Sequence, residues 1–117
     1  MATYSVYYMR SDFFCEGIRG YNWLKQNNRL PNVADLTKTH VFLKLIEGRE
    51  PEDVYFRMQG ESWSPTGEAR EFVASKGVQH TSMSVGDIVV DHNCRVGFIL
   101  DRIGFRFLGT VTTFDEC

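Results

Sequence analysis

The sequence has few of the residues that mark disulfide-rich or membrane-spanning proteins. Its 117 residues include only three cysteines, an odd number spread far apart, which favours a reducing compartment over a disulfide framework. No apolar run approaches the ~20 residues that a membrane-spanning helix needs. The first ten residues also lack the basic and apolar parts of a secretory signal. These absences predict a cytoplasmic protein with no membrane segment.

An excess of one charge is missing as well. Thirteen Lys and Arg residues oppose fifteen Asp and Glu residues, which gives a formal net charge of −2 and a pI near 5.9. The basic residues are scattered along the chain. This balance excludes a dedicated polyphosphate binder and an acidic DNA mimic. We expect no tight, sequence-independent binding of nucleic acid, with an affinity no better than ~10⁻⁴ M at physiological salt.

Hydrophobic residues, by contrast, are plentiful, at 43% of the chain, and aromatic residues make up 14%. This composition excludes intrinsic disorder and supplies enough apolar surface for one core. The length fits a single domain over residues 1–117.

The pattern of apolar residues predicts the order of the elements. We expect strands at 3–9 and 39–47, the first in a central or covered position because it is aromatic on both faces. A short helix is permitted over 18–27. Between Pro51 and Gly77 we expect two helices, the second capped by Ser64 with Pro65 in its first turn.

The C-terminal part shows a strand period. Apolar runs at 88–90, 96–100 and 105–108 are joined by short connections, which is typical of an antiparallel meander. The tail from Val111 to Cys117 either adds a short strand or frays. The predicted fold class is therefore α+β, with N-terminal strands, a helical middle and a C-terminal antiparallel β-meander.

Two structural expectations follow from these elements. Gly86, just before a strand, should adopt a backbone conformation that is costly for other residues. The apolar stripes of the predicted helices and strands should share one core. The residues expected in that core are Leu43, Leu45, Phe72, Phe105 and Phe107.

The segment from His80 to Asp87 is the most polar candidate for chemistry. A histidine near the hydroxyls of Ser82 and Ser84 and a carboxylate suggests a nucleophile with its general base. The sequence contains no GxSxG motif, and the alternative is a loop whose hydroxyls cap turns. No set of residues stands out as catalytic.

The loop around Trp63 is a second candidate, because an exposed tryptophan often anchors a partner, whereas a buried one fills the gap between helices. The candidate binding residues are Trp63, Arg70, His80, Ser82 and Ser84. Neither GxxxxGK[ST] nor GxGxxG occurs. Cys94 beside His92 and Asp91 lacks a second pair of donors, so we expect neither a metal nor a cofactor.

Arg95, Arg102 and Arg106 lie on consecutive predicted strands or turns, next to Phe105 and Phe107. Together they would resemble a small nucleic-acid platform. Strict alternation, however, places Arg106 on the face opposite the two aromatic residues, which favours a core role for the aromatics.

One stretch resembles a known family. The segments SMSVGDI, from Ser82, and DRIGFRFL, from Asp101, are similar to the motifs that open and close the YodL-like domain, over residues 80–108. The resemblance implies a small accessory protein of plasmids, phages or other mobile elements, and it implies no chemistry and no site residues.

Three classes of function remain open at this point. The first is a cytosolic, non-enzymatic protein that binds another macromolecule, expected to be a protein, for example as an inhibitor of a host defence system. The second is a nucleic-acid-binding module that uses the C-terminal sheet. The third is a small hydrolase or transferase centred on His80.

Overall fold

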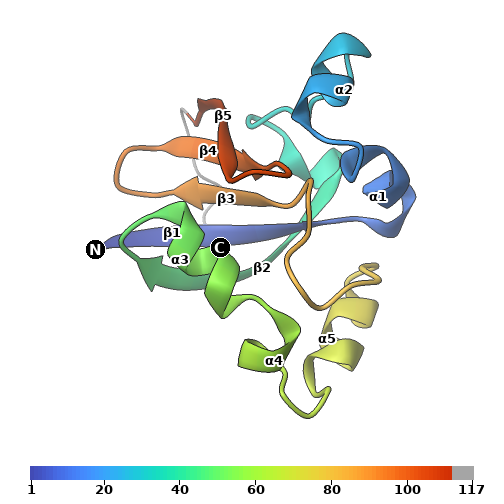
Figure 1. Ribbon diagram of the computed structural model, residues 1–117, viewed down its shortest axis with the longest axis vertical. Helices are drawn as coiled ribbons and strands as arrows, with labels where there is room; N and C mark the ends of the chain where they lie inside the picture. Colours follow the sequence, from blue (N-terminus) through green and yellow to red (C-terminus); the bar gives the residue numbers. More distant parts are fainter. Residues whose placement is uncertain (112–117) are drawn as a thin grey trace.

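The computed structural model describes residues 1–111 and shows one five-stranded sheet with helices around it (Figure 1). The elements in chain order are β1 (Ala2–Met9), α1 (Ser11–Gly17), α2 (Tyr21–Gln26), the 3-10 helix η1 (Leu36–Lys38), β2 (His40–Gly48), α3 (Pro51–Arg57), α4 (Gly60–Trp63), α5 (Ala69–Ser75), β3 (Ile88–Asp91), β4 (Val96–Leu100) and β5 (Phe105–Thr110). The predicted α+β class and its meander are confirmed.

The tail expected beyond Val111 lies outside the described residues. Within 1–111, no helix is long and apolar enough to cross a membrane.

Strand β1 lies inside the sheet, whose order is β2-β1-β3-β4-β5. It pairs antiparallel with β2 on one side and with β3 on the other. Its side chains are buried on both faces, since Tyr4, Ser5 and Val6 are all buried in succession. This confirms the central position that the aromatic pattern predicts, because such a strand cannot stand at an exposed edge.

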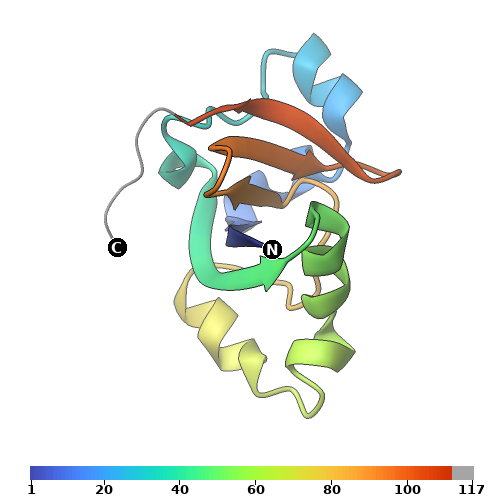
Figure 2. The same cartoon turned by 90° about the vertical axis from the view of Figure 1, so that its left-hand side faces the viewer.

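Helices lie on both sides of the sheet (Figure 2), and a cluster of buried side chains covers each of its faces. One joins alternate residues of β1 to α3 and α5, and it includes Tyr8, Val54 and Val73. The other joins Ile88 and neighbouring strand residues to α1, α2 and η1. The strands are therefore sandwiched between two groups of helices, which explains their dense apolar sequence.

A bulge between β1 and β2 changes which residues of β2 face the core. Val6 pairs with Lys44, but the next residue of β1, Tyr7, pairs with Phe42, so Leu43 is the extra residue. A bulge shifts the two-residue alternation by one position. As a result Leu43 is buried whereas Leu45 is 53% exposed. The expectation that Leu45 belongs to the core is wrong for this reason.

Phe72 and Phe107 also lie outside the predicted core. Phe105 packs against the core, but Phe107 is 59% exposed, because β5 is the last strand of the sheet. Phe72 is exposed because α5 buries its Ala69 and Val73 face instead. Of the five residues expected in one core, only Leu43 and Phe105 are placed there.

Two helices differ from what the sequence predicts. Helix α1 was not expected, since Ser11, Asp12 and Gly17 are typical of turns, yet Phe13 anchors it and Gly17 packs closely on Met9 and Phe13. Helix α5 begins at Ala69, five residues after Ser64. The Ser64 hydroxyl nevertheless accepts a hydrogen bond from the Ala69 backbone N–H at 2.8 Å, so it caps the helix from a distance.

Candidate functional site

Four of the five candidate binding residues lie around one hollow. Arg70 of α5 faces the segment that carries His80, Ser82 and Ser84, and together they line an open depression of about 460 Å³. The fifth, Trp63, is half-buried, and its indole N–H donates to the Thr81 carbonyl at 2.7 Å. Trp63 thus holds this segment in place and packs against the core.

Asp87 is the centre of the polar interactions in this part of the molecule. Its carboxylate has no exposed surface and accepts three hydrogen bonds of 2.8 Å each. The donors are the Met9 backbone N–H, the Ser84 backbone N–H and His80 Nε2. Burial raises the pKa of Asp87, and the bond from His80 and those from the two backbone N–H groups oppose that rise. Asp87 therefore ties β1 to the loop that precedes β3.

His80 is held between aromatic rings. Its ring stacks on Tyr8 with centroids 4.7 Å apart and planes 8° apart, and Phe14 lies 5.0 Å away at a tilt. Because Nε2 faces the Asp87 carboxylate, it carries the proton of that hydrogen bond. The other ring nitrogen, Nδ1, is buried and has no hydrogen-bond partner among the described residues.

His40 and Gly86 form the second half of this cluster. His40 Nε2 donates to the Gly86 carbonyl at 2.7 Å, and Nδ1 lies 2.7 Å from the Thr39 hydroxyl. Burial lowers the pKa of His40 to about 4, although the bond to Gly86 acts against this shift. His40 is therefore neutral at pH 7. We call His40, His80, Gly86 and Asp87 the polar cluster.

Gly86 has a φ of +101°, as the sequence predicts. A Cβ at this position would lie 2.5 Å from Met9 Sδ and 2.8 Å from the backbone of Gly17. The residue therefore needs both the left-handed backbone and the missing side chain.

The hydroxyls near His80 bond to the backbone. Ser82 Oγ accepts from the Gly60 N–H at 2.7 Å, at the start of α4, and Ser84 Oγ donates to the Ser82 carbonyl at 3.0 Å. Neither bonds to a ring nitrogen of His80, whose Nε2 faces Asp87. Their geometry is that of turn-capping side chains.

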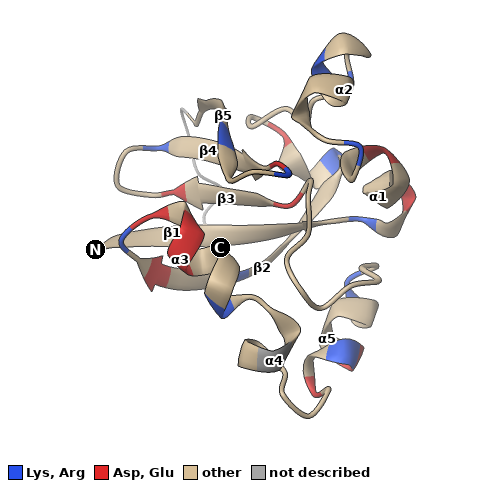
Figure 3. Ribbon diagram, in the orientation of Figure 1, with Lys and Arg blue, Asp and Glu red and all other residues tan. Residues whose placement is uncertain are grey.

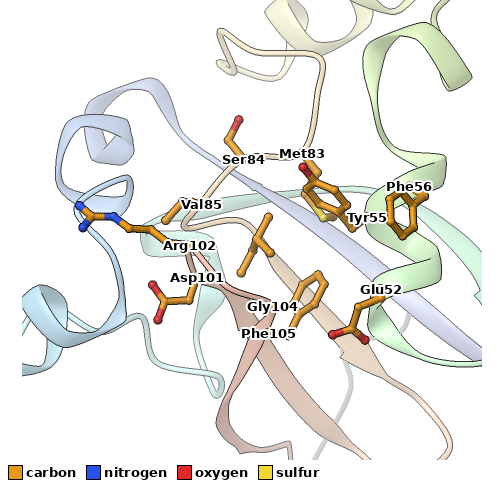
Figure 4. Close-up of a pocket in the computed structure, with 11 residues that line it drawn as sticks. Glu52, Tyr55, Phe56, Met83, Ser84, Val85, Asp101, Arg102, Gly104 and Phe105 are labelled. Atoms are coloured by element: carbon orange, nitrogen blue, oxygen red, sulfur yellow. The ribbon is translucent and has the colours of Figure 1, made fainter.

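A larger, more apolar groove lies on the other side of this loop, between α3 and the β4–β5 hairpin (Figure 4). Its volume is about 480 Å³. The residues that line it are Glu52, Tyr55, Phe56, Met83, Ser84, Val85, Leu100, Asp101, Arg102, Gly104 and Phe105. Figure 4 shows Asp101 and Arg102 at the side opposite Glu52 and Phe56, with the Phe105 ring between them.

Exposed apolar side chains lie in the lining of this groove and in the segments that form it. Phe56 is 66% exposed, and Ile103, in the β4–β5 turn, is 92% exposed. Phe107 continues the face of Phe105 along β5, which is the edge strand of the sheet. We call the groove together with Phe107 and the edge of β5 the β5 groove.

The three C-terminal arginines do not gather at one place. Arg102 and Arg106 line a small pocket with Arg19, on the α2 side of the hairpin. Arg95 precedes β4 and is not one of the residues that line this pocket. As predicted from alternation, Arg106 faces away from Phe105, but the aromatic residue next to it, Phe107, is exposed.

Metal-ligand clusters of three or more His, Cys, Asp or Glu side chains do not occur in the described part of the chain. Asp91, His92 and Cys94 lie together in sequence, but Asp91 Oδ1 accepts backbone N–H bonds from Asn93 and Cys94, and His92 contacts Ser5. The Asp91 carboxylate thus shapes the β3–β4 turn.

Sequence reasoning missed the β5 groove and the role of Asp87. The exposure of Phe56 could have been predicted from the sequence. It is two positions from both Val54 and Met58, so it lies on the helix face opposite the one that these two residues bury. Asp87 carried none, since one of its donors, the Met9 N–H, is 78 positions away in the chain.

No family model matches the chain, and comparisons with curated proteins and with solved structures find no match.

Proposed function

We propose that this protein binds an extended segment of another protein in the β5 groove. The observation that carries the proposal is an apolar groove of about 480 Å³ beside a sheet edge, with Phe56 exposed in its lining and Phe107 exposed on the edge strand. An edge strand offers unpaired backbone groups that a partner strand can use, and an adjoining pocket gives that pairing specificity.

The charges around the groove define the partner segment further. Acidic residues gather at the start of α3 and the adjoining end of β2, as Figure 3 shows. They are Glu47, Glu50, Glu52 and Asp53, of which Glu52 lines the groove itself. A strand that pairs with β5 and inserts an apolar side chain against Phe105 should therefore carry a basic residue on its α3 side.

The geometry supports peptide binding better than the two alternatives, a hydrolase and a nucleic-acid-binding module. A hydrolase centred on His80 would need a nucleophile within reach of the ring, but the nearby hydroxyls bond to the backbone. A nucleic-acid platform would need its arginines together, but Arg95 lies apart from Arg102 and Arg106.

The resemblance to the YodL-like domain suggests a setting for this binding. In an accessory protein of a plasmid, phage or other mobile element, the partner would be a protein of the host cytoplasm, such as a component of a defence system that the binding inhibits. The resemblance covers part of the groove but implies no chemistry for it, so the partner's chemistry is argued from the charges and apolar residues alone.

A phage-displayed library of random linear peptides, selected on the immobilised protein, tests this proposal. We expect the enriched peptides to share an aromatic or branched aliphatic residue with a basic residue near it. A synthetic version of the strongest peptide should bind Phe56→Ser and Phe107→Ser at least about tenfold more weakly than it binds the wild type. The reason is that a few large side chains supply most of the binding free energy of an interface.

Leu45→Ser is the matched control, because Leu45 is equally apolar and 53% exposed but lies on β2, away from the groove. It should leave the affinity within about twofold. Enriched peptides that lose affinity with Leu45→Ser and keep it with Phe56→Ser would contradict the proposal. A wild-type dimer in sedimentation that Phe56→Ser dissociates would also contradict it, because the occupant would then be a second copy.

A further inference from the structure

The pocket on the α2 side of the β4–β5 hairpin brings together three arginines from distant parts of the chain. Arg19 comes from the connection between α1 and α2, Arg102 from the β4–β5 turn and Arg106 from β5. The pocket has a volume of about 270 Å³, and Tyr21, Asn22 and Asp101 also line it. No local pattern links Arg19 to the other two, since 83 positions separate it from Arg102.

Aromatic rings and backbone contacts hold the guanidinium groups in place. Arg19 lies over the Trp23 ring, 4.6 Å from its centroid, and Arg106 lies over the Tyr21 ring at 4.3 Å. Arg102 donates a long hydrogen bond of 3.4 Å to the Arg19 carbonyl. A guanidinium that stacks on a ring keeps its N–H edges free for a ligand, and its orientation is fixed before the ligand arrives.

The charge of the pocket is only partly neutralised. Asp101 bonds to Arg106 Nη1 at 3.2 Å and accepts a further bond from the Tyr21 backbone N–H at 3.3 Å. It is the one carboxylate among the lining residues, so three arginines leave the pocket with an excess of positive charge. This excess persists although the chain as a whole carries −2.

We propose that this pocket binds a phosphomonoester group. A phosphomonoester carries about −1.5 to −2 charges near pH 7 and presents three acceptor oxygens, which matches two uncompensated guanidinium groups. A phosphodiester carries a single negative charge and leaves part of that excess unpaired. A phosphorylated side chain of a protein and a free mononucleotide share the chemistry that the pocket recognises, and its size suits the phosphate with only a small part of either ligand.

The pocket is distinct from the β5 groove, although Asp101 and Arg102 border both. The phosphomonoester site does not depend on a peptide in the groove. Binding of either ligand can therefore fail without the other.

Calorimetric titration of the full chain tests the proposal, with inorganic phosphate, O-phosphoserine and AMP as probes. Serine and adenosine serve as unphosphorylated counterparts, and an oligothymidine without terminal phosphates serves as the diester probe. We expect the three phosphorylated probes to bind and the unphosphorylated counterparts not to bind. The stronger of O-phosphoserine and AMP then identifies a phosphoprotein or a nucleotide as the source.

The variants locate the binding in this pocket. Arg102→Gln and Arg19→Gln should each weaken the affinity for the phosphorylated probes by about tenfold, since each removes a hydrogen bond between two charged groups. Arg102→Lys keeps the charge but loses the planar guanidinium, and it should recover only part of the loss. Arg49→Gln, which removes the same charge from an exposed residue of the β2–α3 connection, should change the affinity by less than about twofold.

Three results would overturn the proposal. One is the absence of binding by all phosphorylated probes to a wild type that is folded by circular dichroism. Another is an effect of Arg49→Gln as large as that of Arg102→Gln. The third is tighter binding of the oligothymidine than of AMP, which would indicate a nucleic-acid backbone as the ligand.

Discussion

The polar cluster and the β5 groove each have a structural setting opposite to the one that their residue types suggest. The polar cluster contains two histidines and a buried aspartate, which are typical of catalysis, but nearly all of its polar atoms bond within the protein. The β5 groove contains phenylalanines typical of a core, but Phe56 and Phe107 are exposed. Here the polar residues stabilise the fold, whereas exposed apolar residues lie at the groove that we propose as a binding site.

The largest effect should come from Asp87. Asp87→Ala removes the carboxylate that accepts from the buried Met9 N–H and from two part-buried donors, the Ser84 N–H and His80 Nε2. We expect the free energy of unfolding to fall by about 3–5 kcal/mol. Urea denaturation followed by circular dichroism measures it. A loss below about 1 kcal/mol would mean that the polar cluster is not structural.

Gly86→Val should have the next largest effect, because its Cβ would meet Met9 and the backbone of Gly17 at a positive φ. We expect a loss of about 2–4 kcal/mol from strain and overpacking together. Gly67→Ala is the control, since Gly67 also has a positive φ, +83°, but nothing lies within 4 Å of an added Cβ. That control should cost only about 1 kcal/mol, and equal losses at both positions would show that packing around Gly86 is loose.

The buried His40 should make stability depend on pH. Its pKa is about 4 in the folded protein and 6.5 in the unfolded chain, so the unfolded chain takes up a proton first as the pH falls. The stabilisation is present above pH 6.5 and is lost as the pH falls toward 4. Between pH 7 and pH 5 we expect a loss of about 2 kcal/mol, measured by urea denaturation at each pH.

His40→Asn separates this contribution from that of the carboxylates. The variant should be less stable at pH 7, because the hydrogen bond to Gly86 is altered. Its stability should change less between pH 7 and pH 5 than that of the wild type. An unchanged slope would show that His40 is not the group responsible.

The smallest effect on stability should come from the exposed aromatics of the β5 groove. Phe56→Ser and Phe107→Ser should each lower the free energy of unfolding by less than about 1 kcal/mol, because most of each ring is already in water. Thermal unfolding measures this directly. A loss near 3 kcal/mol for Phe107→Ser would return that residue to the core and remove it from the proposed interface.

The parts of the fold that could be predicted are those with local signals in the sequence. Strand β1 and the meander were predicted because dense aromatic residues, alternation and turn residues are local signals. The buried face of β2 could not be predicted fully, because the one-residue bulge at Leu43 that shifts its alternation depends on pairing with β1. Helix α1 was missed because Gly17 is favourable there only through its close packing on Met9.

The candidate site was predictable to a similar extent. Arg70, His80, Ser82 and Ser84 do line one hollow, as their spacing in a single loop allows. Their polar atoms, however, are engaged by distant elements such as the Met9 N–H of β1, through Asp87. The β5 groove could not be foreseen, because it depends on where α3 lies relative to a hairpin about fifty residues later in the chain.

The most direct test of peptide binding in the β5 groove is a map of the residues that a bound peptide contacts. Amide proton–nitrogen spectra of the labelled chain, recorded with the strongest peptide from the library selection, report each residue separately. If the peptide binds in the β5 groove, the largest shifts should fall on β5, on α3 and on residues 83–85. Shifts concentrated instead at Arg70, Val78 and Gln79, around the hollow beside His80, would contradict it.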